Sequence, residues 1–346
     1  MILCDVSVNC FEREVKKNNY KIIIYGYGVI GKITAPQFLL DLGLKNNFCC
    51  YVDADKHKQG KYDNFGLGKI NVCNPEKMAE IRDEFVILIT GSRYASILDY
   101  LEKQEKLRAI KVFILPLMLE KESSFNKKID IWKASEEQVI PKVIHYCWFG
   151  GEPLSASMKK CMATWKKYCP DYEIVRWDEK NYDVYKYKYM KQAYESGKWA
   201  FVSDVARIDI LYEYGGIYLD TDVELIKNLD ELLYQPGFCG VEKWRILNSG
   251  GGCGGRPRNS MIGKILDLRK EIEFIFEDGM INMESSGIYE TLPFLRNGFK
   301  ADNTFQIIND MAIYPSDVFH PFDSVTKKCN ITENTFSIHH FSGTWL

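Results

Sequence analysis

The chain has 346 residues, of which 46% are hydrophobic and 27% are charged. This length exceeds that of a typical single core, so we expect two domains. The composition is that of a globular protein and excludes a disordered or fibrous one. The formal net charge of -2 argues against a nucleic acid partner, because general nucleic acid binding needs a basic surface.

Targeting signals and cysteine patterns give no sign of export. The strongest apolar run, residues 112–119, is too short to span a bilayer, and no basic segment precedes the apolar residues at the start of the chain. The 11 Cys residues contain no CxxC pair, so neither a zinc site nor a disulfide framework is predicted. We therefore expect a cytoplasmic location, with at most peripheral association with the inner face of a membrane.

The first third of the chain alternates between predicted strands and helices. Short apolar segments predict buried strands at 21–25, 48–53, 85–90 and 111–115, and helices are predicted at 33–42 and 94–103. This alternation is typical of a parallel sheet. The resulting prediction is a small Rossmann-like parallel α/β domain at 1–120, a polar linker at 121–138 and a second α/β domain at 139–346.

A glycine-rich turn follows the first predicted strand. Gly26, Gly28 and Gly31 form a GxGxxG pattern, and Asp53 ends the next strand. Glycine lets the backbone approach a pyrophosphate, and an acid at this spacing can bind a ribose. One interpretation is a second nucleotide site at these four residues, as in an NAD(P)-dependent oxidoreductase. The other is a turn kept for tight packing of strand and helix, since no catalytic His, Lys or Tyr is evident beside a nicotinamide.

An acidic pair follows a helix and a short strand in the segment 200–224. Gly215-Gly216 ends the helix, and the predicted strand 217–219 leads into Asp220-Thr221-Asp222. Two carboxylates two residues apart at a strand end suit a hard divalent cation, with positions left open for a diphosphate. The segment therefore predicts a metal site of the DXD kind.

Two further features accompany the acidic pair. Asp204 and Arg207 lie three residues apart on the predicted helix, either as a surface ion pair or as a pair that binds donor groups. The glycine-rich run 248–255 lacks the Lys-Ser/Thr of a Walker loop. We expect a loop over the cleft there, with Asn248 as a candidate for donor contact.

Three segments, at 140–150, 200–224 and 339–345, resemble a family of glycosyltransferases with a DXD motif. This family includes a yeast mannosyltransferase and bacterial capsular polysaccharide enzymes, and the resemblance covers about residues 140–346. The segments are similar, more distantly, to the glucosyltransferase domain of large clostridial toxins. The resemblance implies an α/β fold of the GT-A nucleotide-sugar-binding type with a mixed sheet. It also implies a Mn²⁺ or Mg²⁺ ion, a nucleotide-sugar donor and retention at the anomeric carbon.

The resemblance also implies roles for individual residues. The catalytic residues would be Asp204, Arg207, Asp220 and Asp222. The donor would contact Trp148, Tyr218, Asn248, Thr344 and Trp345. The metal ligands would be Asp222 and a C-terminal histidine, with Asp220 as a further candidate. Adjacent residues of an extended segment point to opposite sides, so only one of His339 and His340 is expected to bind the metal, and His340 is preferred.

Together these patterns predict a retaining, metal-dependent hexosyltransferase. The expected donor is a UDP-hexose, with GDP-mannose second. The expected acceptor is a saccharide or lipid-linked oligosaccharide of capsule, exopolysaccharide or lipopolysaccharide synthesis. Two alternatives remain open: the NAD(P)-dependent oxidoreductase, and a sugar-binding protein without catalytic activity.

Overall fold

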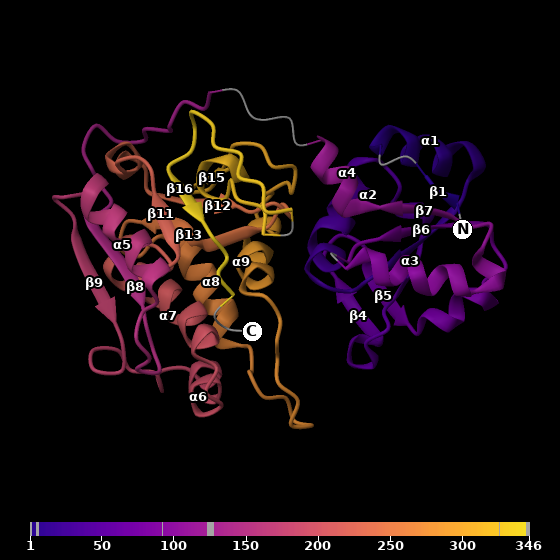
Figure 1. Cartoon of the computed structure of the whole chain (residues 1–346), viewed down its shortest axis with the longest axis horizontal. Helices are drawn as coiled ribbons and strands as arrows, with labels where there is room; N and C mark the ends of the chain where they lie inside the picture. Colours follow the sequence, from indigo (N-terminus) through magenta and orange to yellow (C-terminus); the bar gives the residue numbers. More distant parts are fainter. Residues whose placement is uncertain (1, 5–6, 92, 123–127, 325, 344–346) are drawn as a thin grey trace. The chain divides into compact units, whose positions relative to one another are not determined.

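A computed structural model describes residues 2–4, 7–91, 93–122, 128–324 and 326–343. The chain forms two compact units, Met1–Ser124 and Phe125–Leu346 (Figure 1). Ile129, Ile131 and Trp132 fall within the predicted linker, yet they pack against the core of the second unit. The segment from residue 128 onward is thus part of the C-terminal unit rather than a free connection.

The N-terminal unit is built on a seven-stranded sheet in the order β1-β7-β6-β2-β3-β5-β4. Its strands are β1 (Ile2–Leu3), β2 (Lys21–Tyr25), β3 (Phe48–Val52), β4 (Gly60–Asn64), β5 (Gly68–Cys73), β6 (Phe85–Ile89) and β7 (Lys111–Ile114). All neighbours pair in parallel except β4 and β5, which form an antiparallel hairpin. The sheet is thus parallel as predicted except at this edge, where the hairpin was not predicted because its polar strands have no continuous apolar run that marks a buried strand.

Helices cover both faces of this sheet. They are α1 (Val8–Asn18), a π-helical turn (Ile30–Thr34) continued by α2 (Ala35–Asp41), α3 (Tyr94–Lys103) and α4 (Leu115–Glu122), with short 3₁₀ turns between strands. On one face, Phe11 of α1 contacts Phe38 of α2 and Phe113 of β7. On the other, Leu101 of α3 packs with Ile23 and Ile87. Burial on both faces explains why the predicted strands read as unbroken apolar runs.

The C-terminal unit contains a second seven-stranded sheet, in the order β14-β15-β12-β13-β10-β8-β9. Its strands are β8 (Val143–Cys147), β9 (Glu173–Trp177), β10 (Gly216–Tyr218), β12 (Gly237–Val241), β13 (Leu247–Gly255), β14 (Gln306–Ile308) and β15 (Met311–Tyr314). β10 pairs in parallel with β8 and antiparallel with β13. The unit has the mixed sheet predicted for a GT-A type fold, and the α/β class is confirmed.

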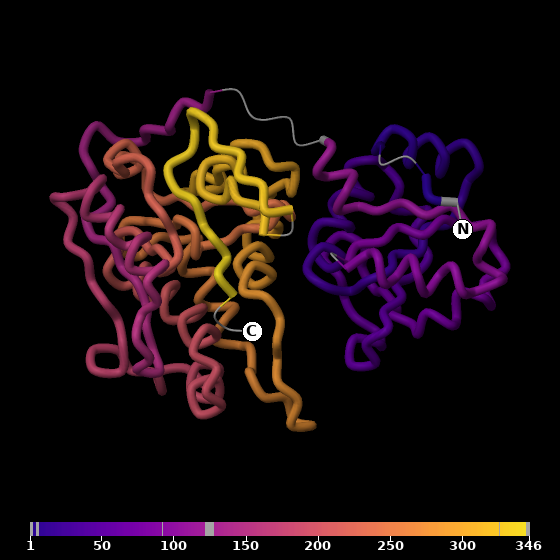
Figure 2. Tube along the Cα trace, in the orientation of Figure 1, coloured from indigo at the N-terminus to yellow at the C-terminus, as the bar shows by residue number. Residues whose placement is uncertain are grey.

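A separate two-stranded sheet joins β11 (Val223–Leu225) to β16 (Ser337–His339). The trace in Figure 2 shows the yellow end of the chain returning through the C-terminal unit to make this pairing. The helices of this unit are α5 (Ala156–Tyr168), α6 (Lys188–Glu195), α7 (Trp199–Tyr214), α8 (Ser260–Lys270), α9 (Ser286–Leu295) and α10 (Ser316–Phe319). α7 packs against β8, β10 and β13, and β10 is the strand that leads into the acidic pair.

Among the described residues, none of the helices combines the length and the apolar character that crossing a membrane requires.

Candidate active site

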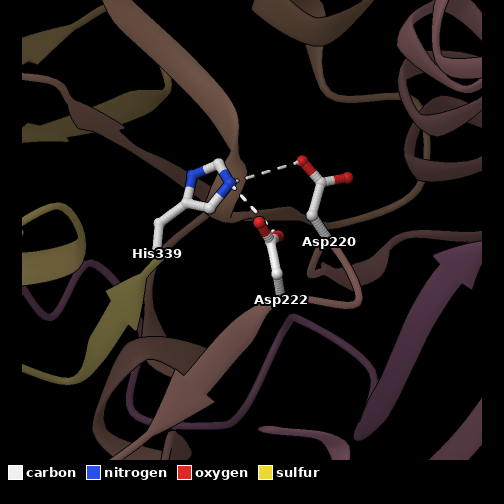
Figure 3. A group of neighbouring side chains, drawn as sticks. All are labelled: Asp220, Asp222 and His339. Carbon is white, nitrogen blue, oxygen red and sulfur yellow. Dashed lines mark ion pairs between the residues drawn. The ribbon is translucent and has the colours of Figure 1, made fainter. Parts of the chain in front are cut away.

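The acidic pair lies in the short connection between β10 and β11. β10 ends at Tyr218, one residue earlier than the predicted strand. The backbone N–H of Asp220 donates to the carbonyl of Gly250 on β13 at 2.8 Å, and the N–H of Val223 donates to the carbonyl of Asp220 at 3.0 Å. These two bonds fold the connection so that the carboxylates of Asp220 and Asp222 both face the ring of His339 (Figure 3).

His339 completes a three-residue cluster with the acidic pair. It lies directly opposite Val223 in the β11–β16 ladder. Its Nε2 is 3.4 Å from Asp222 Oδ1 and 3.8 Å from Asp220 Oδ2 (Figure 3). One donor atom from each of the three side chains lies within 4.8 Å of the others. This is the one group in the described chain that brings together three or more side chains able to hold a metal ion.

His340 lies outside this cluster, which corrects the preference for it as the metal ligand. Its Nε2 is 3.0 Å from Glu224 Oε2. Adjacent residues at the end of a strand point to opposite sides, and the register of β16 gives the inward side to His339. The side on which each histidine falls depends on strand pairing, which the two adjacent letters of the sequence do not reveal.

The cluster is electrostatically paired even without a cation. Burial raises the pKa of Asp222, but a hydrogen bond with His339 and one from the backbone N–H of Ser342 (2.7 Å) outweigh it, so its pKa is lowered. Burial lowers the pKa of His339, but the carboxylates of Asp222 and Asp220 outweigh it, so its pKa is raised. The imidazole of His339 therefore lies beside both carboxylates, which favour its protonated form.

The glycine-rich run is the buried strand β13, not the flexible loop that was expected. A Cβ on Gly250 would lie 2.1 Å from Asp220 Oδ2, and one on Gly251 would lie 2.2 Å from the ring of His320. Glycine is required because the side chains of Asp220 and His320 lie directly against this strand. A run of glycines in a sequence suggests a flexible loop. In the structure these glycines instead let neighbouring side chains lie close to the backbone of the strand.

Asn248 is the second residue of this strand and lies two residues before Gly250. Its side-chain amide donates to Glu242 at 2.9 Å, and its side-chain carbonyl accepts from the N–H of Gly250 at 2.9 Å. His320 contacts the Asn248 carbonyl through Nε2 at 3.1 Å, and its ring centre is 5.5 Å from that of His339. Asn248 therefore holds the local shape of β13, which is compatible with its predicted position near a donor.

Arg207 is buried behind the acidic pair, with only 5% of its side chain exposed. It donates from NH2 to Asp204 at 2.7 Å, to Glu290 at 3.1 Å and to Ser286 at 2.8 Å. NH1 lies 3.4 Å from Asp220. The alternative of a surface ion pair is therefore excluded, because Asp204 and Arg207 form a buried pair whose guanidinium also contacts Asp220.

Asp204 and Tyr218 differ in how open they are. The side chain of Asp204 is 18% exposed, and burial raises its pKa against the opposing effect of Arg207. Tyr218 is 1% exposed and donates its hydroxyl to Asp220 at 3.0 Å. Asp204 can still face a ligand, whereas Tyr218 supports Asp220 from inside the protein.

The predicted donor residues at the ends of the segments are placed as follows. Trp148 directly follows β8 and donates its indole N–H to the carbonyl of Glu152 at 2.5 Å. Since β8 and β10 are parallel, their carboxyl ends share one edge of the sheet, and Trp148 lies at the edge that carries Asp220. Thr344 and Trp345 lie outside the described residues.

The residues of the cluster fit a divalent cation. Two carboxylates supply hard oxygen ligands and one imidazole supplies nitrogen, a set that suits Mn²⁺ better than Mg²⁺. The cradle is preformed, since Gly250 leaves room for the Asp220 carboxylate where a Cβ would stand 2.1 Å from it. Behind the cluster, the carboxylates of Asp204 and Glu290 outnumber the one positive charge of Arg207, and this excess of negative charge favours a cation.

The N-terminal glycine-rich turn is closed on itself. The carboxylate of Asp53 accepts the N–H of Tyr27 at 2.7 Å and that of Asp55 at 2.9 Å. A Cβ on Gly31 would lie 2.1 Å from the carbonyl of Gly26. Of the three glycines of this pattern, Gly28 alone would leave an added Cβ with no heavy atom within 4 Å. Three of the four proposed nucleotide-binding residues therefore have a structural use, and nothing in the described part of this unit supports the oxidoreductase alternative.

Comparison with known proteins shows that the acidic pair lies in a region similar to known glycosyltransferases. Residues 155–239 match the family described as "Glycosyltransferase sugar-binding region containing DXD motif". Inositol phosphoceramide mannosyltransferase 3 of Schizosaccharomyces pombe is 34% identical over 112 residues, which are 30% of this chain and 30% of that protein. Mannosyl phosphorylinositol ceramide synthase SUR1 of Saccharomyces cerevisiae is 33% identical over 105 residues, 29% of this chain and 27% of that protein.

These matches confirm the resemblance to glycosyltransferases with a DXD motif. The chain spans about 30% of the length of these curated relatives, so the match concerns one region and not the whole of either protein. A solved structure described as "PaToxG Glycosyltransferase" matches 45% of this chain and 68% of its own, with 22% identity and a TM-score of 0.38. A likeness of that size adds nothing to the functional argument.

Several residues of the site were not predicted from the sequence. Glu290, Ser286, Ser249, Glu242 and His320 all contact the predicted residues or one another. One signal for Glu290 was available, since it is the only charged residue in the otherwise uncharged helix sequence SGIYETLPFL. A lone carboxylate on such a helix needs a buried partner.

Proposed function

We propose that the protein is a metal-dependent glycosyltransferase that moves a hexosyl group from a nucleotide sugar to a saccharide or lipid-linked acceptor. The observation that carries the proposal is the meeting of Asp220, Asp222 and His339 at the end of β10, with both acids inside the region 155–239 that matches the DXD family. Neither the metal-ligand geometry nor the family match alone would carry it, because acidic clusters are common without an ion.

The residues divide the work of transfer in this proposal. Asp220, Asp222 and His339 would hold Mn²⁺, which when bound neutralises negative charge on the nucleoside diphosphate that leaves. Arg207 holds Asp220 in place through its 3.4 Å contact. Asp204, partly exposed beside it, accepts hydrogen bonds from hydroxyls of the donor sugar. Trp148, at the same sheet edge, stacks on the donor base.

Retention at the anomeric carbon is part of the proposal and comes from the family resemblance. In the step we propose, the acceptor hydroxyl attacks the anomeric carbon on the face from which the diphosphate leaves. The bond from that carbon to the diphosphate oxygen breaks, and the hydroxyl proton passes to that oxygen. Proton NMR of the first product formed reads the anomeric configuration directly, and an inverted product would contradict this step.

The donor and acceptor are proposed at two levels. The resemblance favours a UDP-hexose as the donor. Since the similar proteins include an inositol phosphoceramide mannosyltransferase, we propose a mannosyl donor such as GDP-mannose as an equal candidate. The acceptor is proposed to be a growing saccharide or lipid-linked oligosaccharide of surface polysaccharide synthesis, met at the cytoplasmic face of a membrane.

Thermal unfolding with a panel of ligands tests the proposal. UDP, GDP, UDP-hexoses, GDP-mannose and NAD(P)H are each added with Mn²⁺ and with EDTA. A ligand at ~100 times its Kd adds about 2.7 kcal/mol, which raises the melting midpoint by a few degrees. We expect a shift from one nucleotide family, only with Mn²⁺, and its loss in Asp222→Asn together with sugar transfer. A shift from NAD(P)H alone, or undiminished transfer by Asp222→Asn, would overturn the proposal.

A further inference from the structure

A buried carboxylate outside the DXD segment lies at the centre of the polar contacts behind it. Glu290 is on α9 and its side chain is 2% exposed. Its neighbours on the helix are largely apolar and buried, including Ile288 and Phe294. An ionised carboxylate so placed must be fully paired to be tolerated in the interior, which makes its partners informative.

Glu290 is paired with two separate elements. Oε1 accepts from Arg207 NH2 on α7 at 3.1 Å and from the hydroxyl of Ser249 on β13 at 2.8 Å. Oε2 accepts the backbone N–H of Ser249 at 2.8 Å. One side chain thus connects the helix that carries Arg207 with the strand that carries the glycine run.

Both of these connections end at Asp220. Arg207 reaches Asp220 through NH1 at 3.4 Å. Gly250, the residue after Ser249, accepts the backbone N–H of Asp220 at 2.8 Å and leaves the space in which its carboxylate lies. A shift of either α7 or β13 would therefore move the Asp220 carboxylate away from Asp222 and His339, and Glu290 opposes both shifts.

We propose that Glu290 is a positioning residue that fixes the Asp220 carboxylate for metal binding by fastening Arg207 and Ser249 to α9. In this proposal Glu290 acts on Asp220 through Arg207 and Ser249, the two residues with which its carboxylate is paired. The inference rests on the proposed function, because it assigns a role within the same metal site. Residues that orient metal ligands from behind typically change metal affinity or activity by 10–100-fold when replaced.

Glu290→Gln tests the role with the least change in shape. The amide nitrogen cannot accept a hydrogen bond, so it must oppose either the Ser249 N–H or the guanidinium of Arg207. Asp209→Asn is the matched control. Asp209 is also 2% exposed and lies on α7, but it accepts from Tyr182, Tyr187 and Lys186, away from the cluster.

Three quantities are measured on the full chain: the Kd for Mn²⁺ by calorimetry without donor, the Mn²⁺ concentration for half-maximal transfer, and the melting midpoint. For Glu290→Gln we expect both Mn²⁺ constants to rise by about 10–100-fold. For Asp209→Asn we expect a comparable loss of melting midpoint with Mn²⁺ constants within about twofold of the wild type. If Glu290→Gln does not fold, Ser249→Ala removes one of the same bonds and should raise the Mn²⁺ constants in the same direction by a smaller factor.

The outcomes separate the two proposals. A wild-type protein that neither binds Mn²⁺ nor transfers sugar overturns the proposed function. An active wild type whose Mn²⁺ constants match those of Glu290→Gln, or a rise in these constants equally large in Asp209→Asn, overturns the positioning role alone.

Discussion

Two glycine-rich segments of this chain look alike in the sequence and serve different ends. The turn at Gly26–Gly31 closes on itself: Gly31 lies against Gly26, and Asp53 accepts the backbone N–H of Tyr27. In the strand β13, by contrast, side chains from other elements pack directly on the glycine backbone: Asp220 lies against Gly250 and His320 against Gly251. Glycine clusters thus report close approach, and only the identity of the approaching group distinguishes packing from a functional site.

The largest effect that this comparison predicts is that of Gly250→Ala. The added methyl would stand 2.1 Å from Asp220 Oδ2, and the carboxylate is the part that can turn away. We expect a loss of transfer on the order of 100-fold or more, as when one electrostatic group of an active site is removed, with a folded protein. Transfer assays beside circular dichroism check this. Full activity would show that the Asp220 position is not needed.

The adjacent histidines at the end of β16 also differ in what they contact: His339 lies beside the acidic pair and His340 beside Glu224. His339→Asn removes the nitrogen beside both carboxylates, so we expect the Mn²⁺ concentration for half-maximal transfer to rise by about 10–100-fold. His340→Asn is the matched variant, because its side chain pairs with Glu224 instead, and its effect should be much smaller. A larger effect of His340→Asn than of His339→Asn would instead support His340 as the metal ligand, as preferred from the sequence.

A third close approach predicts a pH effect on stability. The ring of His145 lies against Gly216, and burial lowers its pKa from 6.5 to about 4. The unfolded chain therefore binds a proton that the folded one excludes, and stability should fall as the pH drops from about 6.5 to about 4. At 1.36 kcal/mol per pKa unit, His145 contributes on the order of 3 kcal/mol to this loss.

Urea unfolding at pH 7 and pH 4.5 measures this effect. All 7 Trp residues lie at position 132 or later, so their fluorescence follows the C-terminal unit. His145→Gln keeps a donor for the carbonyl of Gly215 without a titrating ring, and should show a smaller loss than the wild type. His57→Gln, at an exposed position, is the control. Parallel losses in all three proteins would contradict the assignment.

The smallest effect is expected at Gly28. Open space surrounds it, whereas a Cβ on Gly31 would lie 2.1 Å from the backbone of Gly26. Gly28→Ala should change the free energy of unfolding by less than about 1 kcal/mol, and Gly31→Ala should destabilise by about 1–3 kcal/mol or more. Urea titration checks both. A nucleotide-induced melting shift that disappears in Gly28→Ala would instead reveal a live nucleotide site in the N-terminal unit.

The sequence predicted well what depends on neighbours along the chain. The strand at Lys21–Tyr25, the helix at Tyr94–Lys103 and the glycine stop after α7 are all found, because periodicity and turn residues act locally. The acidic pair was predicted for the same reason, because it follows a short apolar strand directly along the chain. The β4–β5 hairpin was missed because its polar, half-exposed strands carry no strong apolar pattern.

What the sequence by itself determined is the acidic pair and its place just after a short strand. Only the tertiary structure decided which histidine joins it, because the register of β11 with β16 gives the inward side to His339. The tertiary structure also decided that Glu290 on α9 pairs with Arg207 and Ser249, and that the glycine run is the strand β13 inside the sheet. Contacts between segments far apart in the chain depend on pairing and packing, which no local pattern encodes.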